Sequence, residues 1–196
     1  MKIATAHLVS SSAYSQSKNI DRETVPAKEK ESHDAYEKRT WRHRIHSNEK
    51  GFVIIPCTCF AATIKTAAKR LALPVPGKRG ALFGKFFEAG IQVVDDLALK
   101  IKADDVPGER LFVPSDGRPG GGKRVYRTFP RIDSWEGDVV FHVFDDIISA
   151  DVFKEVLVSA GQLVGIGRFR PENRGFYGRF SVSSIKWSDF AKERKA

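Results

Sequence analysis

The sequence of 196 residues contains only two cysteines, Cys57 and Cys59, and a single residue separates them. A disulfide between residues this close would be strained, and no further cysteine supplies the spacing of a zinc site. Scarce cysteine suits the reducing cytoplasm, where we expect the protein to act. We interpret both cysteines as small packing residues.

Long apolar runs are missing from the start of the chain. Residues 1–9 combine one lysine with several apolar residues, but Thr5 and His7 interrupt them, which excludes a signal peptide or a membrane span there. Acidic residues are in deficit, because 24 Asp and Glu face 33 Lys and Arg and leave a formal net charge of +9. Such a chain favours nucleic acid or an anionic lipid surface as its partner, and charge alone does not choose between them.

The motifs of nucleotide cofactors and of nucleophilic catalysis are absent too. Gly165 and Gly167 match the first two glycines of a dinucleotide-binding fingerprint, but Arg170 occupies the third position and Pro171 follows it. The lysine of a P-loop is missing, and the histidines within residues 10–48 have no serine or cysteine nucleophile motif beside them. We therefore expect no cofactor and no covalent catalysis.

Adjacent aspartates are the one pattern that a metal-dependent nuclease could use. They occur at residues 95–96, 104–105 and 145–146. Neighbouring residues on a strand point to opposite faces, so such a pair rarely binds one ion, and residues 145–146 fit a strand-to-helix turn better. We expect no metal site and no enzymatic activity, and cleavage through Asp116 or Asp145 stays an alternative.

Apolar periodicity predicts several short strands and two helices. Residues 2–9 alternate as a strand, a helix through residues 60–71 is expected to be capped near Thr58, and a second helix is capped by Ser149 and stopped by Gly161. Further strands are predicted at residues 52–56, 111–113, 124–132, 139–144, 163–169 and 176–187, with a strand pair or a bent strand at 90–101.

This order of elements predicts an α+β fold with a ferredoxin-like or RRM-like βαββαβ core, inserted loops and a protruding β-hairpin. We expect one domain over residues 1–196. A densely charged insertion at about 10–48 lacks a clean apolar face, so it should lie at the periphery or become ordered on binding. A thumb-like hairpin is expected at about 114–131, around a glycine-rich tip.

Residues 165–180, which we call the glycine-arginine segment, are the clearest sign of a polyanion partner. Four arginines face one glutamate there, and four minus one leaves a charge of +3. Arginine can bind phosphate with two N–H groups, and each base stacked on an aromatic ring contributes roughly 1–3 kcal/mol. Strand alternation would turn about half of the aromatic residues into the core. A tight turn with a solvated rim is the alternative interpretation.

Two further segments, residues 65–85 and 118–131, carry lysine and arginine with no acid between them. Segregated positive charge is more typical of a surface that follows a phosphate backbone than of an evenly charged solubility surface, although a single charge run is often only a solvated face. The candidate RNA-binding residues are Lys65, Lys69, Arg70, Lys78, Arg79, Arg118, Lys123, Arg124, Arg127, Gly165, Gly167, Arg168, Phe169, Arg170, Arg174, Tyr177 and Arg179.

Several features occur together in one order. Ile55-Pro56 leads into the basic helix that ends near Arg70, a second helix ends at Ala160-Gly161, and residues 165–178 follow with their glycines. Together they resemble the RAMP superfamily of CRISPR-associated proteins, and most closely its backbone subunit, which polymerises along a guide RNA.

The resemblance implies a role for each feature. A helix after the Ile-Pro strand end would line the RNA path, the glycine-rich loop would shape the RNA-facing surface, and a thumb hairpin would space the bases of the guide. Cys57-Thr-Cys59 replaces the usual serine-rich turn, and the chain is short, which suggests a compact relative carried by a phage or another mobile element. Some backbone subunits cleave target RNA with a thumb-loop aspartate, for which Asp116 is the nearby candidate.

We therefore expect a non-catalytic RNA-binding protein that oligomerises along a guide RNA as the backbone of an RNA-guided recognition complex. Its partners would be single-stranded guide RNA and further copies of itself. A complementary target strand is an additional option, and we expect no binding to a membrane. One alternative is a sequence-nonspecific single-stranded DNA-binding or annealing protein of a phage. Another is a metal-dependent RNase.

Overall fold

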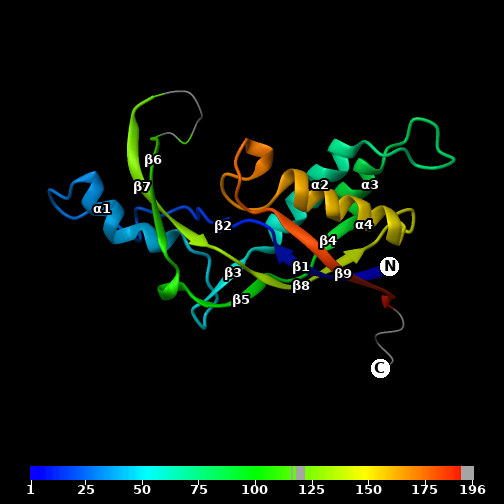
Figure 1. Ribbon diagram of the computed structural model, residues 1–196, viewed down its shortest axis with the longest axis horizontal. Helices are drawn as coiled ribbons and strands as arrows, with labels where there is room; N and C mark the ends of the chain where they lie inside the picture. The colour runs from blue at the N-terminus through cyan, green and yellow to red at the C-terminus, as the bar shows by residue number, and fades with distance from the viewer. Residues whose placement is uncertain (116, 118–121, 191–196) are drawn as a thin grey trace.

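The main sheet of the protein has four antiparallel strands with helices above it (Figure 1). The computed structural model describes residues 1–115, 117 and 122–190. The strand order is β4 (Ile91–Val93), β8 (Glu136–Val143), β1 (Lys2–Ser10) and β9 (Phe180–Asp189). The helices α2 (Cys57–Leu71) and α4 (Ala150–Ser159) lie on one side of this sheet. Mixed helices and antiparallel sheets confirm the predicted α+β class.

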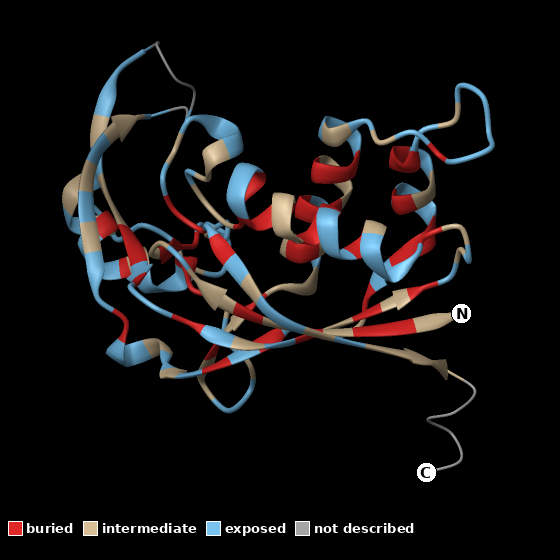
Figure 2. Ribbon diagram, turned by 45° about the vertical axis from the view of Figure 1, so that its right-hand side comes forward, coloured by how far each residue is buried: buried red, intermediate tan, exposed pale blue. Residues whose placement is uncertain are grey.

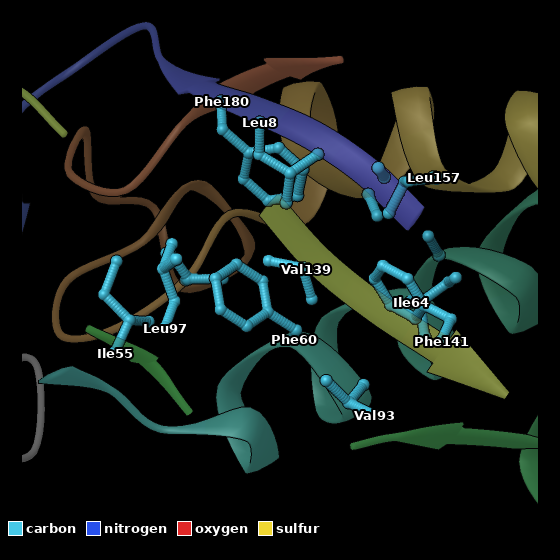
Figure 3. Packing of buried hydrophobic residues seen from close by; sticks show 14 of the residues in the cluster. Leu8, Ile55, Phe60, Ile64, Val93, Leu97, Val139, Phe141, Leu157 and Phe180 are labelled. Atoms are coloured by element: carbon cyan, nitrogen blue, oxygen red, sulfur yellow. The ribbon is translucent and has the colours of Figure 1, made fainter. Parts of the chain in front are cut away.

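The hydrophobic core lies between this sheet and the helices. In β1, Ala4, Ala6 and Leu8 are fully buried, whereas Thr5 and His7 between them are partly exposed, as the alternation of the sequence predicts. Figure 3 shows side chains from the sheet meeting side chains from α2 and α4 in one cluster; those labelled include Leu8, Val139, Phe141, Phe180, Phe60, Ile64 and Leu157. Burial of this apolar surface is the main stabilising contribution to the fold.

Helix α2 begins at Cys57, before the predicted range of 60–71, and Thr58 is not its cap. Pro56 occupies the N-cap position, and the exposed amide of Cys57 donates to Asp96 Oδ1 at 2.8 Å. An aspartate from a distant segment therefore satisfies a helix N–H that a local side chain usually accepts. The helix ends at Ala72, which has a left-handed φ of 48°.

Helix α4 also differs from the prediction at its end. The Oγ of Ser149 accepts a hydrogen bond from the Val152 amide at 3.3 Å, which confirms the predicted N-cap. Gly161 does not stop the helix, because a π-helical turn, η3 (Ala160–Val164), continues it to Gly165. A Cβ on Gly161 would lie 2.1 Å from the carbonyl oxygen of Phe180, so this glycine is required for packing against β9. The predicted strand at residues 163–169 is therefore wrong.

Several short elements join the main sheet to the rest of the molecule. The expected strand pair at residues 90–101 consists instead of β4 and a separate strand, β5 (Leu97–Lys102), which pairs with β3 (Phe52–Ile55). An unpredicted helix, α3 (Phe83–Gly90), precedes β4 and buries Phe83 and Phe87. The short 3-10 turn η2 (Ala103–Asp105) leads from β5 towards a β-hairpin.

The β-hairpin extends away from the main sheet at the left of Figure 1. It consists of β6 (Gly108–Pro114) and β7 (Arg124–Ile132), which pair in continuous antiparallel register from Gly108 opposite Pro130 to Pro114 opposite Arg124. Strands were predicted at both places. The arms therefore carry their alternate side chains to two opposite faces of the hairpin.

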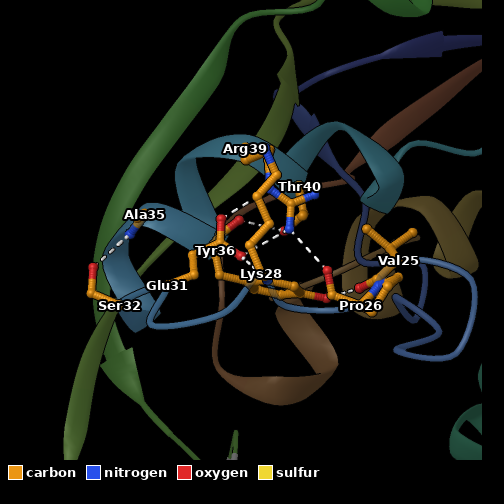
Figure 4. Close-up of polar contacts among 9 residues, drawn as sticks. All are labelled: Val25, Pro26, Lys28, Glu31, Ser32, Ala35, Tyr36, Arg39 and Thr40. Carbon is orange, nitrogen blue, oxygen red and sulfur yellow. Dashed lines mark hydrogen bonds and ion pairs between the residues drawn. The ribbon is translucent and has the colours of Figure 1, made fainter.

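Residues 10–48 contain β2 (Tyr14–Ser15), α1 (His33–Thr40) and the 3-10 turn η1 (Trp41–Arg44). The start of this segment is not peripheral, because residues 14–16 are about 1% exposed and β2 pairs with β7. Farther along, a network of polar contacts closes residues 25–40 on themselves (Figure 4). In it the guanidinium of Arg39 binds both carboxylate oxygens of Glu31, each at 2.9 Å. Within the described ranges, every helix is too short or too polar to span a bilayer.

Candidate nucleic-acid interface

The glycine-arginine segment folds as a compact loop between η3 and β9, and contains the 3-10 turn η4 (Pro171–Asn173). The Ile166 amide donates to the Gly178 carbonyl at 2.9 Å, which closes the loop, and the Gly178 amide donates to Ala13 at 2.7 Å. Gly178 has a φ of 75°, and a Cβ there would lie 1.9 Å from the Ile166 carbonyl oxygen. Only glycine fits this position, so the residue type determines the shape of the loop.

A cleft of about 460 Å³ lies between this loop, the first turn of α2 and residues 14–17. Arg168 and Arg170 line it on the loop side, and Thr58 and Cys59 line it on the helix side. The start of a helix carries partial positive charge, which the Asp96 carboxylate already offsets at the Cys57 amide, so the two arginines are the main cationic groups of the cleft. The cleft is therefore electrostatically suited to an anion.

Arg168 is the cation in the cleft wall that has the fewest polar partners. The Cζ of its guanidinium lies 3.6 Å from the ring centroid of Phe129 on β7. Its Nε and Nη2 atoms are shielded from solvent and have no hydrogen-bond partner among the described residues. Burial lowers the pKa of the guanidinium, because a desolvated charge without an acceptor is disfavoured. Tyr177 and Glu109 oppose this lowering, but neither accepts a hydrogen bond from Nε or Nη2.

The other arginines of the loop have different environments. Arg170 forms an ion pair with Glu172, with 2.6 Å between Nη2 and Oε2. Arg179 donates from Nε to the carbonyl of Gln162 at 3.1 Å. Arg174 is exposed, and no acidic side chain of the described residues pairs with it. The loop thus presents Arg174 and Arg179 to solvent at its rim and Arg168 and Arg170 to the cleft.

Two aromatic residues of the loop are exposed and two are buried, in the proportion that was expected. Phe169 and Phe176 are 44% and 57% exposed, and their ring centroids lie 5.6 Å apart, edge to face. Phe180 belongs to the core, and Tyr177, predicted to contact RNA, is only 2% exposed. The Tyr177 hydroxyl donates to Glu109, and burial followed by this bond raises its pKa to about 12. Tyr177 therefore holds the loop in place and presents no face to a base.

Helix α2 and the loop after it, which carry the second group of predicted cations, lie above the main sheet in Figure 1. Lys69 is paired with Glu88 at 2.8 Å, and Arg70 donates to the carbonyl of Leu163 at 3.3 Å. Lys65 is partly buried on the same helix. Lys78 and Arg79 are exposed in the loop between α2 and α3, at the end of the molecule away from the hairpin. These cations are therefore spread over the helix side rather than gathered in the cleft.

The hairpin carries its predicted cations on β7 and just before it. Lys123 is exposed, Arg124 donates to the Phe112 carbonyl at 2.6 Å, and Arg127 donates to the Ser115 carbonyl at 2.7 Å. Arg118 and Asp116 lie outside the described residues. Arg124 and Arg127 on β7 are thus engaged with the backbone of the opposite arm of the hairpin.

The sequence pattern missed an exposed aromatic pair on the hairpin. Phe112 and Tyr126 are opposite one another in register, 49% and 48% exposed, with ring centroids 4.9 Å apart. Arg110 lies 4.1 Å from the ring of Tyr126, and Arg124 lies 5.2 Å from the ring of Phe112. The spacing of two residues between Arg110 and Phe112, and between Arg124 and Tyr126, is the signal that could have found this shared face.

The described parts of the three basic segments lie on the helix side of the main sheet. In Figures 1 and 2 the described arms of the hairpin, the glycine-arginine loop and the loop between α2 and α3 rise on that side, with the glycine-arginine loop between the other two. Exposed residues dominate these outer segments in Figure 2. Three parts of the sequence that carry cations are thus found on one side of the main sheet.

Acidic groups have structural roles in the described part of the chain. Asp145 Oδ1 accepts from the Ile147 amide at 3.0 Å in a turn between β8 and α4, as predicted for residues 145–146. Asp96 caps α2. Over residues 1–115, 117 and 122–190, no three His, Cys, Asp or Glu side chains are grouped to hold a metal ion.

Comparison with known proteins gives distant structural similarities. No protein-family model and no curated protein matches the sequence. A chain in the "Cryo-EM structure of the Type III-B Cmr-beta bound to cognate target RNA" is similar at 9% identity and a TM-score of 0.49, over 96% of this chain and 61% of that one. A chain of a "CRISPR RNA-guided surveillance complex" is similar at 7% identity and a TM-score of 0.37, over 94% and 68%. This chain thus spans less than two thirds of the first of these chains.

Proposed function

We propose that this chain is a non-catalytic RNA-binding protein that assembles in several copies along a guide RNA, as the backbone of an RNA-guided recognition complex. The observation that carries the proposal is Arg168, a lining residue of a cleft of about 460 Å³, whose Nε and Nη2 are shielded from solvent and have no hydrogen-bond partner among the described residues. Shielded N–H groups of a charged side chain are costly unless an acceptor completes them. A backbone phosphate is the anion that suits the cleft, because Arg170 and the start of α2 line it too.

The exposed aromatic rings support a single strand rather than a duplex as the ligand. Phe169 and Phe176 on the loop, and Phe112 and Tyr126 on the hairpin, present faces on which unpaired bases can stack. Stacking tolerates any base, so a surface of this kind follows a strand without reading its sequence. Such tolerance is what a scaffold requires when the guide varies.

The fold of the scaffold is proposed to be a ferredoxin-like core of the RAMP type. Along the chain the elements of the main sheet and its two helices follow the order β1, α2, β4, β8, α4 and β9. This βαββαβ order, with β1 and β8 central, is the arrangement that the resemblance to the RAMP superfamily implies. The β6–β7 hairpin would then serve as the thumb, and residues 10–48 as its support.

The test begins with nucleic acid that copurifies with the protein. We expect a raised ratio of nucleic-acid to protein absorbance, RNA on sequencing, and collapse of the assembly after ribonuclease treatment but not after deoxyribonuclease treatment. Collapse with deoxyribonuclease instead would favour the single-stranded DNA-binding alternative. Monomeric protein free of nucleic acid would contradict the proposal.

Absence of catalysis is tested separately. Labelled RNA incubated with the protein and Mg²⁺ should stay intact for as long as RNA without protein. Degradation that disappears in Asp116→Asn or Asp145→Asn protein would establish the nuclease alternative.

A further inference from the structure

Arg168 is held by an aromatic ring rather than by hydrogen bonds from its side chain. Its Cζ lies 3.6 Å from the centroid of Phe129, while Nε and Nη2 have no partner among the described residues. The backbone amide of Arg168 donates to Ser15 at 2.9 Å, which fixes the main chain of the residue but not its head group. The position of the guanidinium therefore depends on the position of Phe129.

Phe129 in turn depends on residues from the charged segment at 10–48. Its neighbour Thr128 has its amide and carbonyl directed away from β6, and two buried side chains bind them. Glu37 Oε1 accepts from the Thr128 amide at 2.9 Å, and Arg44 Nη1 donates to the Thr128 carbonyl at 3.4 Å. Glu37 and Arg44 thus hold the free edge of β7 beside Phe129, as a neighbouring strand would.

The same two side chains form a buried ion pair. Glu37 and Arg44 approach to 2.8 Å, and their side chains are only 5% and 9% exposed. The Cζ of Arg44 lies 5.3 Å from the ring centroid of Phe129, so two guanidiniums from distant segments share one ring. Glu37 neutralises Arg44, which limits the repulsion between Arg44 and Arg168.

We propose that Glu37 and Arg44 are positioning residues for RNA binding, which act through Thr128 and Phe129 to hold Arg168 in the cleft wall. They touch no ligand themselves. The charged segment at residues 10–48 is then a brace that couples the hairpin to the glycine-arginine loop. This inference rests on the proposed function only for its effect on RNA, because the position of Arg168 can be measured without RNA.

The first measurement uses nuclear magnetic resonance of the arginine Nε–Hε groups in the free protein, with the Arg168 signal assigned from its loss in Arg168→Lys. In the wild-type protein we expect this signal to be shifted upfield by the ring of Phe129 and to exchange slowly with water. In Arg44→Met and Glu37→Gln the signal should move towards its ordinary position and exchange faster. Arg42→Met is the matched control, because Arg42 is exposed in the same turn η1 and binds the carbonyls of Ala103 and Val106 instead.

Two further variants keep the test decisive if the single substitutions at Glu37 and Arg44 prevent folding. If a single substitution at Glu37 or Arg44 prevents folding, the combination Glu37→Gln with Arg44→Gln retains hydrogen-bonding groups at Thr128, and Phe129→Leu removes the ring while leaving the ion pair. Phe129→Leu should release Arg168, whereas the double variant, which keeps the hydrogen bonds at Thr128, should leave it in place. An unchanged Arg168 signal in folded Arg44→Met, Glu37→Gln or Phe129→Leu protein would overturn the inference.

The second measurement is RNA affinity as a function of salt. Arg168→Met should lower the slope of log affinity against log salt by about 0.7, as expected when one contact to a single strand is lost. Arg44→Met should lower the slope equally, and the double variant should bind no more weakly than either single one. Strictly additive losses would contradict the coupling. Failure of wild-type protein to bind RNA would sink the proposed function, while the resonance measurement still decides the role of Glu37 and Arg44.

Discussion

The hydroxyl of Tyr177 donates a hydrogen bond to the carboxylate of Glu109 and joins the glycine-arginine loop to strand β6 of the hairpin. Glu109 also forms an ion pair with Arg131, with 3.4 Å between Arg131 Nη1 and Glu109 Oε1. Two surfaces proposed to contact one RNA strand are therefore fixed relative to each other by side chains that lie beneath them.

Replacing Tyr177 with phenylalanine should loosen this connection. Loss of a hydrogen bond to a charged acceptor is expected to lower the free energy of unfolding by roughly 1.5–3 kcal/mol, measured by denaturant titration. The pKa of Tyr177 is raised from 10 to about 12, so the stabilising effect of the bond is fully present below pH 10 and is lost as pH rises to 12. A tyrosinate absorbance step near pH 12 should be present in the wild type and absent in Tyr177→Phe. Identical alkaline titrations would refute the assignment.

The glycine at position 178 should tolerate alanine less well than a glycine with a similar backbone angle in open space. Gly77 has a φ of 72° and nothing within 4 Å of the place that a Cβ would occupy, whereas a Cβ on Gly178 would meet the Ile166 carbonyl. Gly77→Ala should cost about 1–2 kcal/mol from its left-handed backbone alone. Gly178→Ala should cost about 1–3 kcal/mol more through overpacking, and equal melting temperatures for the two variants would count against the described loop.

The buried and exposed ion pairs of α1 should differ sharply in their contribution to the free energy of unfolding. Glu37→Gln leaves Arg44 buried without its counter-charge and should lower the free energy of unfolding by about 3–5 kcal/mol. Lys38→Gln breaks an exposed pair with Asp34 at 3.0 Å, and the unfolding midpoint should stay close to that of the wild type because water screens this pair. Chemical denaturation of both variants measures the difference, and similar midpoints would argue against a buried pair.

The exposed ring of Phe176 should contribute to RNA affinity. Phe176→Ala is expected to weaken binding by about 1–3 kcal/mol for one stacked base, without changing the salt dependence. Phe144 is the matched control, since it is 49% exposed just after β8 and belongs to none of the three basic segments. Fluorescence anisotropy with a labelled single strand compares the two, and equal losses would show that the loop has no special role.

Acid should release the segment around α1 before the core unfolds. The Arg39 side chain, followed by the Lys28 amide, lowers the pKa of Glu31 from 4.5 to about 2. The stabilisation is therefore present above pH 4.5 and is lost as pH falls from 4.5 to 2. The protection factors of the amides in residues 25–40 should fall over that range, and Glu31→Gln should show low protection factors already at neutral pH. Protection factors in Glu31→Gln that still fall over this pH range would point to another group.

Local patterns predicted the elements whose stabilising contacts are close in sequence. The alternation of Ala4, Ala6 and Leu8 defines one face of β1. Ser149 caps α4, which begins at the next residue. The errors have distant causes. Asp96 displaces Thr58 as the cap of α2, and the carbonyl of Phe180 explains why residue 161 is glycine. No pattern within a short window contains these contacts.

The candidate site was predictable in composition but not in geometry. The density of arginine in residues 165–180 indicated a basic loop, and Arg168 and Arg174 lie on it. Burial of Tyr177 could not be foreseen, because residues 165–179 form a loop rather than paired strands, and the alternation of side chains along a strand does not apply to a loop. The approach of Arg168 to Phe129 joins two segments whose proximity only the folded chain reveals.

Assembly along RNA is the central claim, and native mass spectrometry with a series of RNAs of increasing length tests it most directly. The number of bound copies should increase in whole steps with RNA length, and Arg168→Met should reduce occupancy at every length. DNA strands of the same sequence should bind fewer copies at equal concentration. A single bound copy at all lengths, or equal loading on DNA, would contradict the account.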